Sequence, residues 1–158
     1  MNKQQGFTLI ELVMVIVVLG VLAAFAVPRF ADITTDARVA TVNAVAGSIR
    51  SASALAHATS LAQSRSSGAS ISMEGTQVTM INFYPTSSPT ASPGNSLTGG
   101  IAAALADITG FTLNLSGTAD TIHFRRIGAV NEVTCYAAYR AAVSTTTTPT
   151  ISVDTTGC

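Results

Sequence analysis

The most constraining feature of this 158-residue chain is a long apolar run near its start that contains one carboxylate. From Phe7 to Val27 the run holds 21 residues, and Glu11 is its only charge. About 20 apolar residues in a helix span the roughly 30 Å hydrocarbon core of a bilayer. Lys3 precedes the run, so the positive-inside tendency keeps this end cytoplasmic and places the remainder outside. The chain is therefore expected to enter a membrane with a carboxylate near the start of its helix.

Two simple interpretations of this run stand beside a more specific one. In the first, the run is a plain membrane anchor, and the helix dipole favours Glu11 in the first turn by about 0.3 to 1 kcal/mol. In the second, it is a secretory signal peptide with the small-x-small triplet Ala24-Phe25-Ala26, and its cleavage releases a soluble binding domain from Val27. Against cleavage there, Glu11 offsets the positive charge that orients such peptides, and Pro28 lies just past the cut.

The third interpretation is a resemblance. A polar leader ending at Gly6, followed by Phe7-Thr8-Leu9-Ile10-Glu11 and a long apolar helix, resembles the class III signal of type IV pilins and of the related pseudopilins of type II secretion. It implies that a prepilin peptidase cuts between Gly6 and Phe7 and methylates the new amine of Phe7. It also implies that the leader, residues 1–6, is lost and that the helix over 7–27 stays in the inner membrane before assembly. The start and the Ala-rich stalk are further similar to pilins of the mannose-sensitive haemagglutinin kind.

The resemblance implies that Glu11 acts in subunit assembly. A carboxylate at mid-bilayer costs about 2.5 to 3.5 kcal/mol on insertion scales, and a paired charge removes much of that cost. The amine of Phe7 on a neighbouring subunit, shifted along a filament axis, supplies such a partner. The protein is thus expected to polymerise with itself, through the pilus assembly machinery of the inner membrane, into an extracellular pilus for adhesion, attachment or motility.

Gly20 and Pro28 weaken the helix that contains them. Glycine costs about 1 kcal/mol relative to alanine in a helix, and proline removes a backbone hydrogen bond. In pilin filaments the stretch between the matching residues can lose helical order, so the resemblance implies helix flexibility between these two positions.

After Pro28 the apolar residues recur at steps of three and four, which predicts an amphipathic helix over 28–64 that continues into a globular domain over 65–158. The pattern decays over 63–68, so one helix from about Phe7 to Gln63 is expected. The resemblance implies an α+β fold, in which a long helix with a protruding apolar first half packs on an antiparallel sheet of about four strands. The predicted core face of the helix comprises Phe30, Ile33, Ala37, Val42, Val45, Ile49, Ala52, Ala56 and Thr59.

Strand patterns follow the helix. Residues 71–73 and 77–84 flank a Glu74-Gly75 turn and predict a hairpin, and residues 121–127 and 134–143 are further strand candidates. A Pro/Ser/Gly stretch over 85–100 predicts a surface loop, and residues 101–108 a short helix or turn. The Thr-rich tail contains a proline, which argues for an edge strand or a loop.

The two cysteines, Cys135 and Cys158, are most simply interpreted as one disulfide in an exported chain. A bridge that closes a loop of about 22 residues contributes roughly 3 kcal/mol in the chain-entropy model. In the pilins that this chain resembles, such a pair bounds an exposed and variable C-terminal region.

No catalytic or metal-binding pattern is found in the sequence. The two histidines, His57 and His123, have no His-x-x-His, cysteine cluster or grouped carboxylates nearby, so both are expected to be structural. Arg125 and Arg126 would point to opposite faces of a strand, and the eight acidic residues balance the eight basic ones. We therefore expect no enzyme, no cofactor, no metal and no nucleic-acid partner. Residues 114–116 match a glycosylation sequon, a pattern that often arises by chance.

A secretion pseudopilin would share every N-terminal feature of a pilin. The C-terminal cysteine pair favours a pilin, and a calcium site in the C-terminal loops would favour a pseudopilin. After Glu132 only Asp154 is available for such a site.

Overall fold

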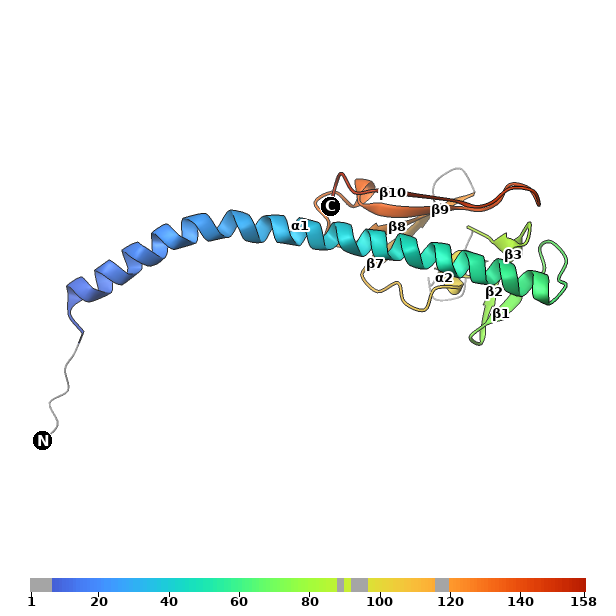
Figure 1. Cartoon of the computed structure of the whole chain (residues 1–158), viewed down its shortest axis with the longest axis horizontal. Helices are drawn as coiled ribbons and strands as arrows, with labels where there is room; N and C mark the ends of the chain where they lie inside the picture. The colour runs from blue at the N-terminus through green and yellow to red at the C-terminus, as the bar shows by residue number, and fades with distance from the viewer. Residues whose placement is uncertain (1–6, 88–89, 92–96, 116–119) are drawn as a thin grey trace, which may run out of the picture. The chain divides into compact units, whose positions relative to one another are not determined.

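The computed structural model describes residues 7–87, 90–91, 97–115 and 120–158 (Figure 1). The expected leader, including Gly6, lies outside these ranges. The chain divides into two compact units, Met1–Ala37 and Arg38–Cys158.

One helix, α1, runs from Leu9 to Ala62 and contributes to both units. Its bounds confirm the helix expected from the sequence to within two residues at each end. In the first unit its side chains from Leu9 to Ala26 are exposed, and this segment has a mean hydropathy of 2.9. By length and composition the segment can cross a membrane.

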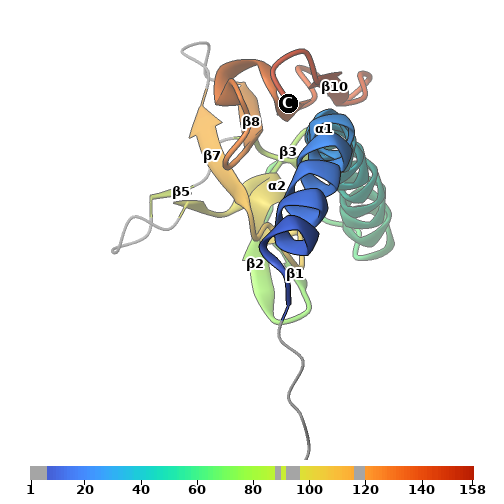
Figure 2. The same cartoon turned by 90° about the vertical axis from the view of Figure 1, so that its left-hand side faces the viewer.

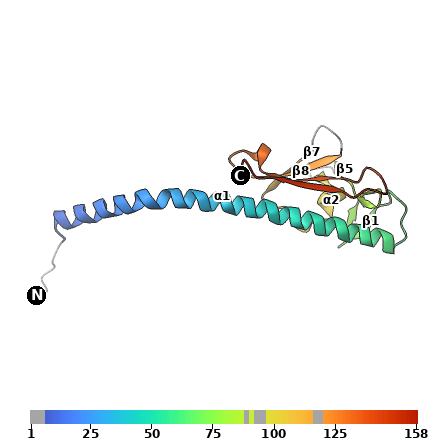
Figure 3. The same ribbon diagram turned by 45° about the horizontal axis from the view of Figure 1, so that its top comes forward.

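The second unit contains a four-stranded antiparallel sheet in the order β10-β9-β8-β7. Figure 3 shows β10 running alongside α1, and the consecutive strands form a meander. The resemblance therefore implied the correct sheet, and the Thr-rich tail supplies its edge strand. The strands are β7 (Phe111–Leu115), β8 (Thr121–Arg126), β9 (Tyr136–Arg140) and β10 (Thr150–Asp154), with the 3-10 helix η1 (Glu132–Thr134) between β8 and β9.

The core of the second unit lies between this sheet and α1. Every second residue of β8 and β9 faces the helix, so Ile122, Phe124 and Tyr139 are buried there. The Tyr139 hydroxyl donates a hydrogen bond to the Pro85 carbonyl at 2.7 Å, and burial raises the pKa of this phenol, which keeps it protonated. From α1 the core receives Val42, Ala46, Ile49 and Ala52, while Ala56 packs in a second cluster with Ile71, Val78 and Met80.

The predicted helix face is therefore confirmed from Val42 to Ala56, with Ala46, Ser53 and Ser60 as buried additions. Ile33 lies in the first unit and is exposed. The side chain of Phe30 lies outside the described ones.

Within the described residues, three short antiparallel strand pairs precede the four-stranded sheet. Strands β1 (Ile71–Met73) and β2 (Thr76–Val78) pair around Glu74 and Gly75, as predicted. The prediction of a single strand over 77–84 is wrong. The chain reverses again at Asn82 and Phe83, both with positive φ, so that β3 (Met80–Ile81) pairs with β4 (Tyr84–Pro85).

The expected loop over 85–100 holds a third pair, β5 (Thr90–Ala91) with β6 (Leu97–Thr98), while residues 88–89 and 92–96 lie outside the described ranges. It ends in the short helix α2 (Gly100–Ala103). In Figures 1 and 2, α2 lies between the β1–β2 hairpin and the four-stranded sheet.

Ser60 is fully buried, and its hydroxyl finds no hydrogen-bond partner in the described part of the chain. An unsatisfied buried hydroxyl costs about 1 to 3 kcal/mol. Ser60→Ala is therefore expected to raise the free energy of unfolding of the full chain in detergent by about 1 kcal/mol, as measured by urea titration followed by circular dichroism. Ser51→Ala, an exposed change on the same helix, is the matched control and should have no effect. A loss of stability in Ser60→Ala would contradict this description of the site.

Candidate functional site

The start of α1 is a capping box formed by Thr8 and Glu11. The Glu11 carboxylate accepts hydrogen bonds from the Thr8 backbone N–H at 2.8 Å and from the Thr8 hydroxyl at 2.6 Å. The Glu11 N–H lies 3.4 Å from the Thr8 hydroxyl oxygen, which completes the reciprocal arrangement. This role of Thr8 was not predicted from the sequence, although the spacing Thr-x-x-Glu before an apolar run indicates it.

The Glu11 carboxylate has no cationic partner within the described residues, because its only contacts there are with Thr8. The side chains around it, including Leu9, Ile10 and Leu12, are exposed and apolar. In a membrane, an unpaired carboxylate beside hydrocarbon costs a few kcal/mol. An amine from outside the described chain would lower that cost.

Helix α1 continues through both Gly20 and Pro28 without a break. A Cβ placed on Gly20 would meet nothing within 4 Å, so packing inside this chain does not require glycine there. Flexibility between these residues stays a prediction.

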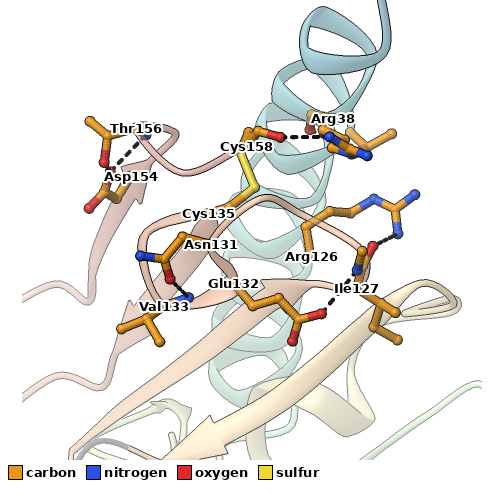
Figure 4. Close-up of a disulfide and its surroundings, with 12 residues drawn as sticks. Arg38, Arg126, Ile127, Asn131, Glu132, Val133, Cys135, Asp154, Thr156 and Cys158 are labelled. Atoms are coloured by element: carbon orange, nitrogen blue, oxygen red, sulfur yellow. Dashed lines mark hydrogen bonds between the residues drawn. A yellow bond between two sulfur atoms is a disulfide. The ribbon is translucent and has the colours of Figure 1, made fainter. Parts of the chain in front are cut away.

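The C-terminus is fastened at several points (Figure 4). The predicted disulfide between Cys135 and Cys158 is confirmed, and both residues are buried. Arg38 donates through Nη1 to the Cys158 carbonyl at 3.0 Å, which joins the last residue to α1. Backbone bonds join Gly157 to Asn131 and to Thr134, so the tail packs against the segment that precedes β9.

The two histidines differ in how well their ring nitrogens are satisfied. His57 stacks on Tyr84 with ring centroids 4.1 Å apart, and its Nδ1 lies 3.0 Å from the Phe83 carbonyl oxygen, as expected of a structural histidine. His123 departs from that expectation, because its buried Nδ1 has no partner among the described residues. Its ring stacks on Tyr136 instead, with centroids 4.5 Å apart.

The adjacent arginines also have different surroundings. Arg126 donates to the Gly110 carbonyl at 2.7 Å and lies over the Phe111 ring, so its guanidinium is used inside the fold. Arg125 has no described hydrogen-bond or ion-pair partner. Asn114 of the sequon lies in β7, and Ser116 falls outside the described residues. Among the described residues no three His, Cys, Asp or Glu side chains gather in a way that could hold a metal ion.

Comparison with known proteins identifies the N-terminal segment. Residues 1–27 match the family described as the prokaryotic N-terminal methylation motif. The chain is 56% identical over 54 residues to the type IV narrow pilus major component PilA5 of Thermus thermophilus. The matched stretch covers 34% of this chain and 47% of that protein. It is 46% identical over 43 residues to the type IV major alpha-pilin of Moraxella bovis, which covers 27% of each chain.

A third relative is the fimbrial protein EcpB of Eikenella corrodens, 48% identical over 59 residues, or 36% of this chain and 37% of that protein. The chain thus spans less than half the length of these relatives. No solved structure matches. The mannose-sensitive haemagglutinin kind is not distinguished by these matches and stays a prediction. The methylation motif and these relatives show that the N-terminal segment of the chain is similar to that of type IV pilins.

Proposed function

We propose that this chain is the structural subunit of a type IV pilus. The observation that carries the proposal is the coincidence, in one segment, of the methylation motif with an apolar helix that keeps a carboxylate at Glu11. The relatives named as major pilus components support the same role.

In the proposed sequence of events, a prepilin peptidase removes residues 1–6 and methylates the new N-terminus at Phe7. The helix over 7–27 then holds the subunit in the inner membrane until the assembly machinery extracts it. In the filament, Glu11 of one copy pairs with the amine of Phe7 on a neighbouring copy. Apolar side chains that are exposed in the single chain, such as Leu9 and Leu19, become buried against other copies.

This role needs no catalytic group. The fastened C-terminus and the sheet provide a rigid unit for the outside of a fibre, and Gly20 and Pro28 provide the proposed flexible stretch within it.

The test is to shear cells that make this protein, collect the extracellular fibres and measure the intact mass without reduction. We expect a species that begins at methylated Phe7 and is lighter by two hydrogens than the reduced chain. A Phe7 start found only in the membrane fraction would instead indicate a pseudopilin of type II secretion. A soluble product that starts at Val27 would contradict both.

A further inference from the structure

The face of the four-stranded sheet that points away from α1 is almost entirely polar. Strand alternation turns Ile122, Phe124 and Tyr139 toward the core, so their neighbours in sequence point outward. We call this set the outer sheet face, and Ala138 is its only apolar member. It comprises Thr112 and Asn114 from β7, Thr121, His123 and Arg125 from β8, Tyr136, Ala138 and Arg140 from β9, and Thr150, Ser152 and Asp154 from β10.

Two guanidinium groups on the outer sheet face have no acidic partner in the described part of the chain. They belong to Arg125, whose Nε is buried without an acceptor, and to Arg140, whose residue is exposed. Arg125 pairs in register with Tyr136, four residues before Arg140, so the two arginines lie about 13 Å apart along the strand direction. The carboxylate of this face, Asp154, already accepts hydrogen bonds from the hydroxyl and the backbone N–H of Thr156, which lower its pKa. The face therefore offers two free cations at a fixed spacing.

A pair of rings lies next to the first of these cations. His123 and Tyr136 stack with centroids 4.5 Å apart, and the Nδ1 of His123 is buried without a partner. Burial and the charge of Arg125 lower the pKa of His123, so its ring is neutral at neutral pH. Flat rings of this kind pack against the apolar faces of other planar or ring-shaped groups.

A hydroxyl-lined cavity of about 460 Å³, open to solvent, adjoins the second cation. Its wall contains Arg140, the exposed Val143 and a set of threonines, and its volume lies in the range of small-molecule sites. The Thr147 hydroxyl is tied to Ser144, while Thr148 and Thr150 have no described side-chain hydrogen bond. The threonines are Thr146, Thr147, Thr148 and Thr150.

We propose that the outer sheet face and this cavity bind an acidic polysaccharide. Arg125 and Arg140 pair with carboxylates of two sugar units, since a guanidinium matches a carboxylate in charge and in bidentate geometry. The ring pair packs on a sugar ring between them, and one unit enters the cavity, where threonine hydroxyls bond to sugar hydroxyls and Val143 contacts its C–H groups.

The same features argue against a single-stranded nucleic acid. Such ligands are held by several stacking platforms along a continuous basic groove, whereas this face has one ring pair and a cavity lined with hydroxyls. The proposal rests on the proposed function in one respect, since it names the kind of surface that a pilus of this protein would bind. A filament would repeat the outer sheet face many times and so strengthen weak binding through multivalency. The binding itself does not require a filament.

The test therefore uses the full chain in detergent micelles, titrated with polygalacturonate by calorimetry. The double variant Arg125→Gln/Arg140→Gln is expected to bind at least about tenfold more weakly, because each change removes a charge-assisted contact. The matched control is Arg50→Gln/Arg65→Gln, which removes the same charge from exposed positions off this face and should bind as wild type does. Tyr136→Leu should also weaken binding while both cations remain.

Two further titrations decide between ligand classes. Fully methyl-esterified polygalacturonate has the same backbone without charge and should not bind measurably. Equal binding of the ester, or equal losses in the two double variants, would overturn the proposal. Oligo(dT) that displaces polygalacturonate would overturn it in favour of nucleic acid. None of these measurements needs a fibre. The polysaccharide proposal can therefore fail while the pilus role stands, and the pilus role can fail while polysaccharide binding stands.

Discussion

Glu11→Gln is expected to remove the sheared pilus fraction almost completely while the protein still accumulates in the membrane. In the proposed filament, Glu11 offsets the amine of Phe7 on a neighbouring copy. Removing one partner of a buried ion pair leaves the other charge uncompensated, at a cost of about 3 to 5 kcal/mol. That cost recurs each time a subunit is added, so even its lower limit is sufficient to prevent elongation of the filament.

Glutamine is the informative substitution because of the capping box. A glutamine at this position also reaches the backbone N–H of Thr8, so the start of α1 keeps its cap. The change therefore removes the charge and retains the local structure. Thr8→Ala is the matched control, since it removes the capping hydroxyl, costs about 1 kcal/mol at the helix end and keeps the carboxylate.

The measurement compares the amount of pilin in the sheared fraction with that in the membrane fraction for wild type, Glu11→Gln and Thr8→Ala. We expect loss of fibres in the first variant and a modest reduction in the second. Normal fibres in Glu11→Gln, together with a larger loss in Thr8→Ala, would show that Glu11 serves the helix end alone. The simple anchor interpretation would then be sufficient for this residue.

Features that depend on local periodicity could be predicted from the sequence. The apolar steps that place Val42, Ile49 and Ala56 on one side of α1 are set by helical geometry, and the structure buries all three. The disulfide followed from an exported chain with two cysteines. Strand β7 was missed although Phe111, Leu113 and Leu115 alternate with polar residues, because the segment is short and follows a loop.

Features that depend on long-range contacts could not be predicted in this way. The reversal at Asn82 and Phe83 places a phenylalanine at positive φ, which no local preference indicates. The segment that contains this reversal is joined to residues remote in sequence through Thr79. The Thr79 hydroxyl forms a hydrogen bond with the Thr86 hydroxyl and accepts one from the Gly100 N–H. The unpaired guanidiniums of the outer sheet face likewise became apparent only when strand register was known.

The second large effect concerns the disulfide. Cys135→Ala/Cys158→Ala is expected to lower the free energy of unfolding by about 3 kcal/mol, since the bridge closes a loop with a sequence separation of 23. The total free energy of unfolding of a small domain is typically about 5 to 15 kcal/mol, so this loss is a large share of it. Urea titration of the full chain in detergent measures it. Thr145→Ala/Thr148→Ala changes two exposed residues inside the same loop and should leave stability within about 0.5 kcal/mol of wild type.

The position of the bridge determines how the loss should appear. Strand β10 is an edge strand that pairs only with β9, and beyond it the tail is held by the bridge, by Arg38 and by backbone bonds to Asn131 and Thr134. Without the bridge, only the hydrogen bond from Arg38 and the backbone hydrogen bonds hold the tail. Strand β10 should therefore open before the other strands of the sheet. Hydrogen exchange should therefore accelerate first over Thr150–Asp154, with β8 still protected. Uniform acceleration across the sheet would mean that the bridge stabilises the whole second unit, and unchanged exchange would mean that Arg38 and the backbone bonds are sufficient.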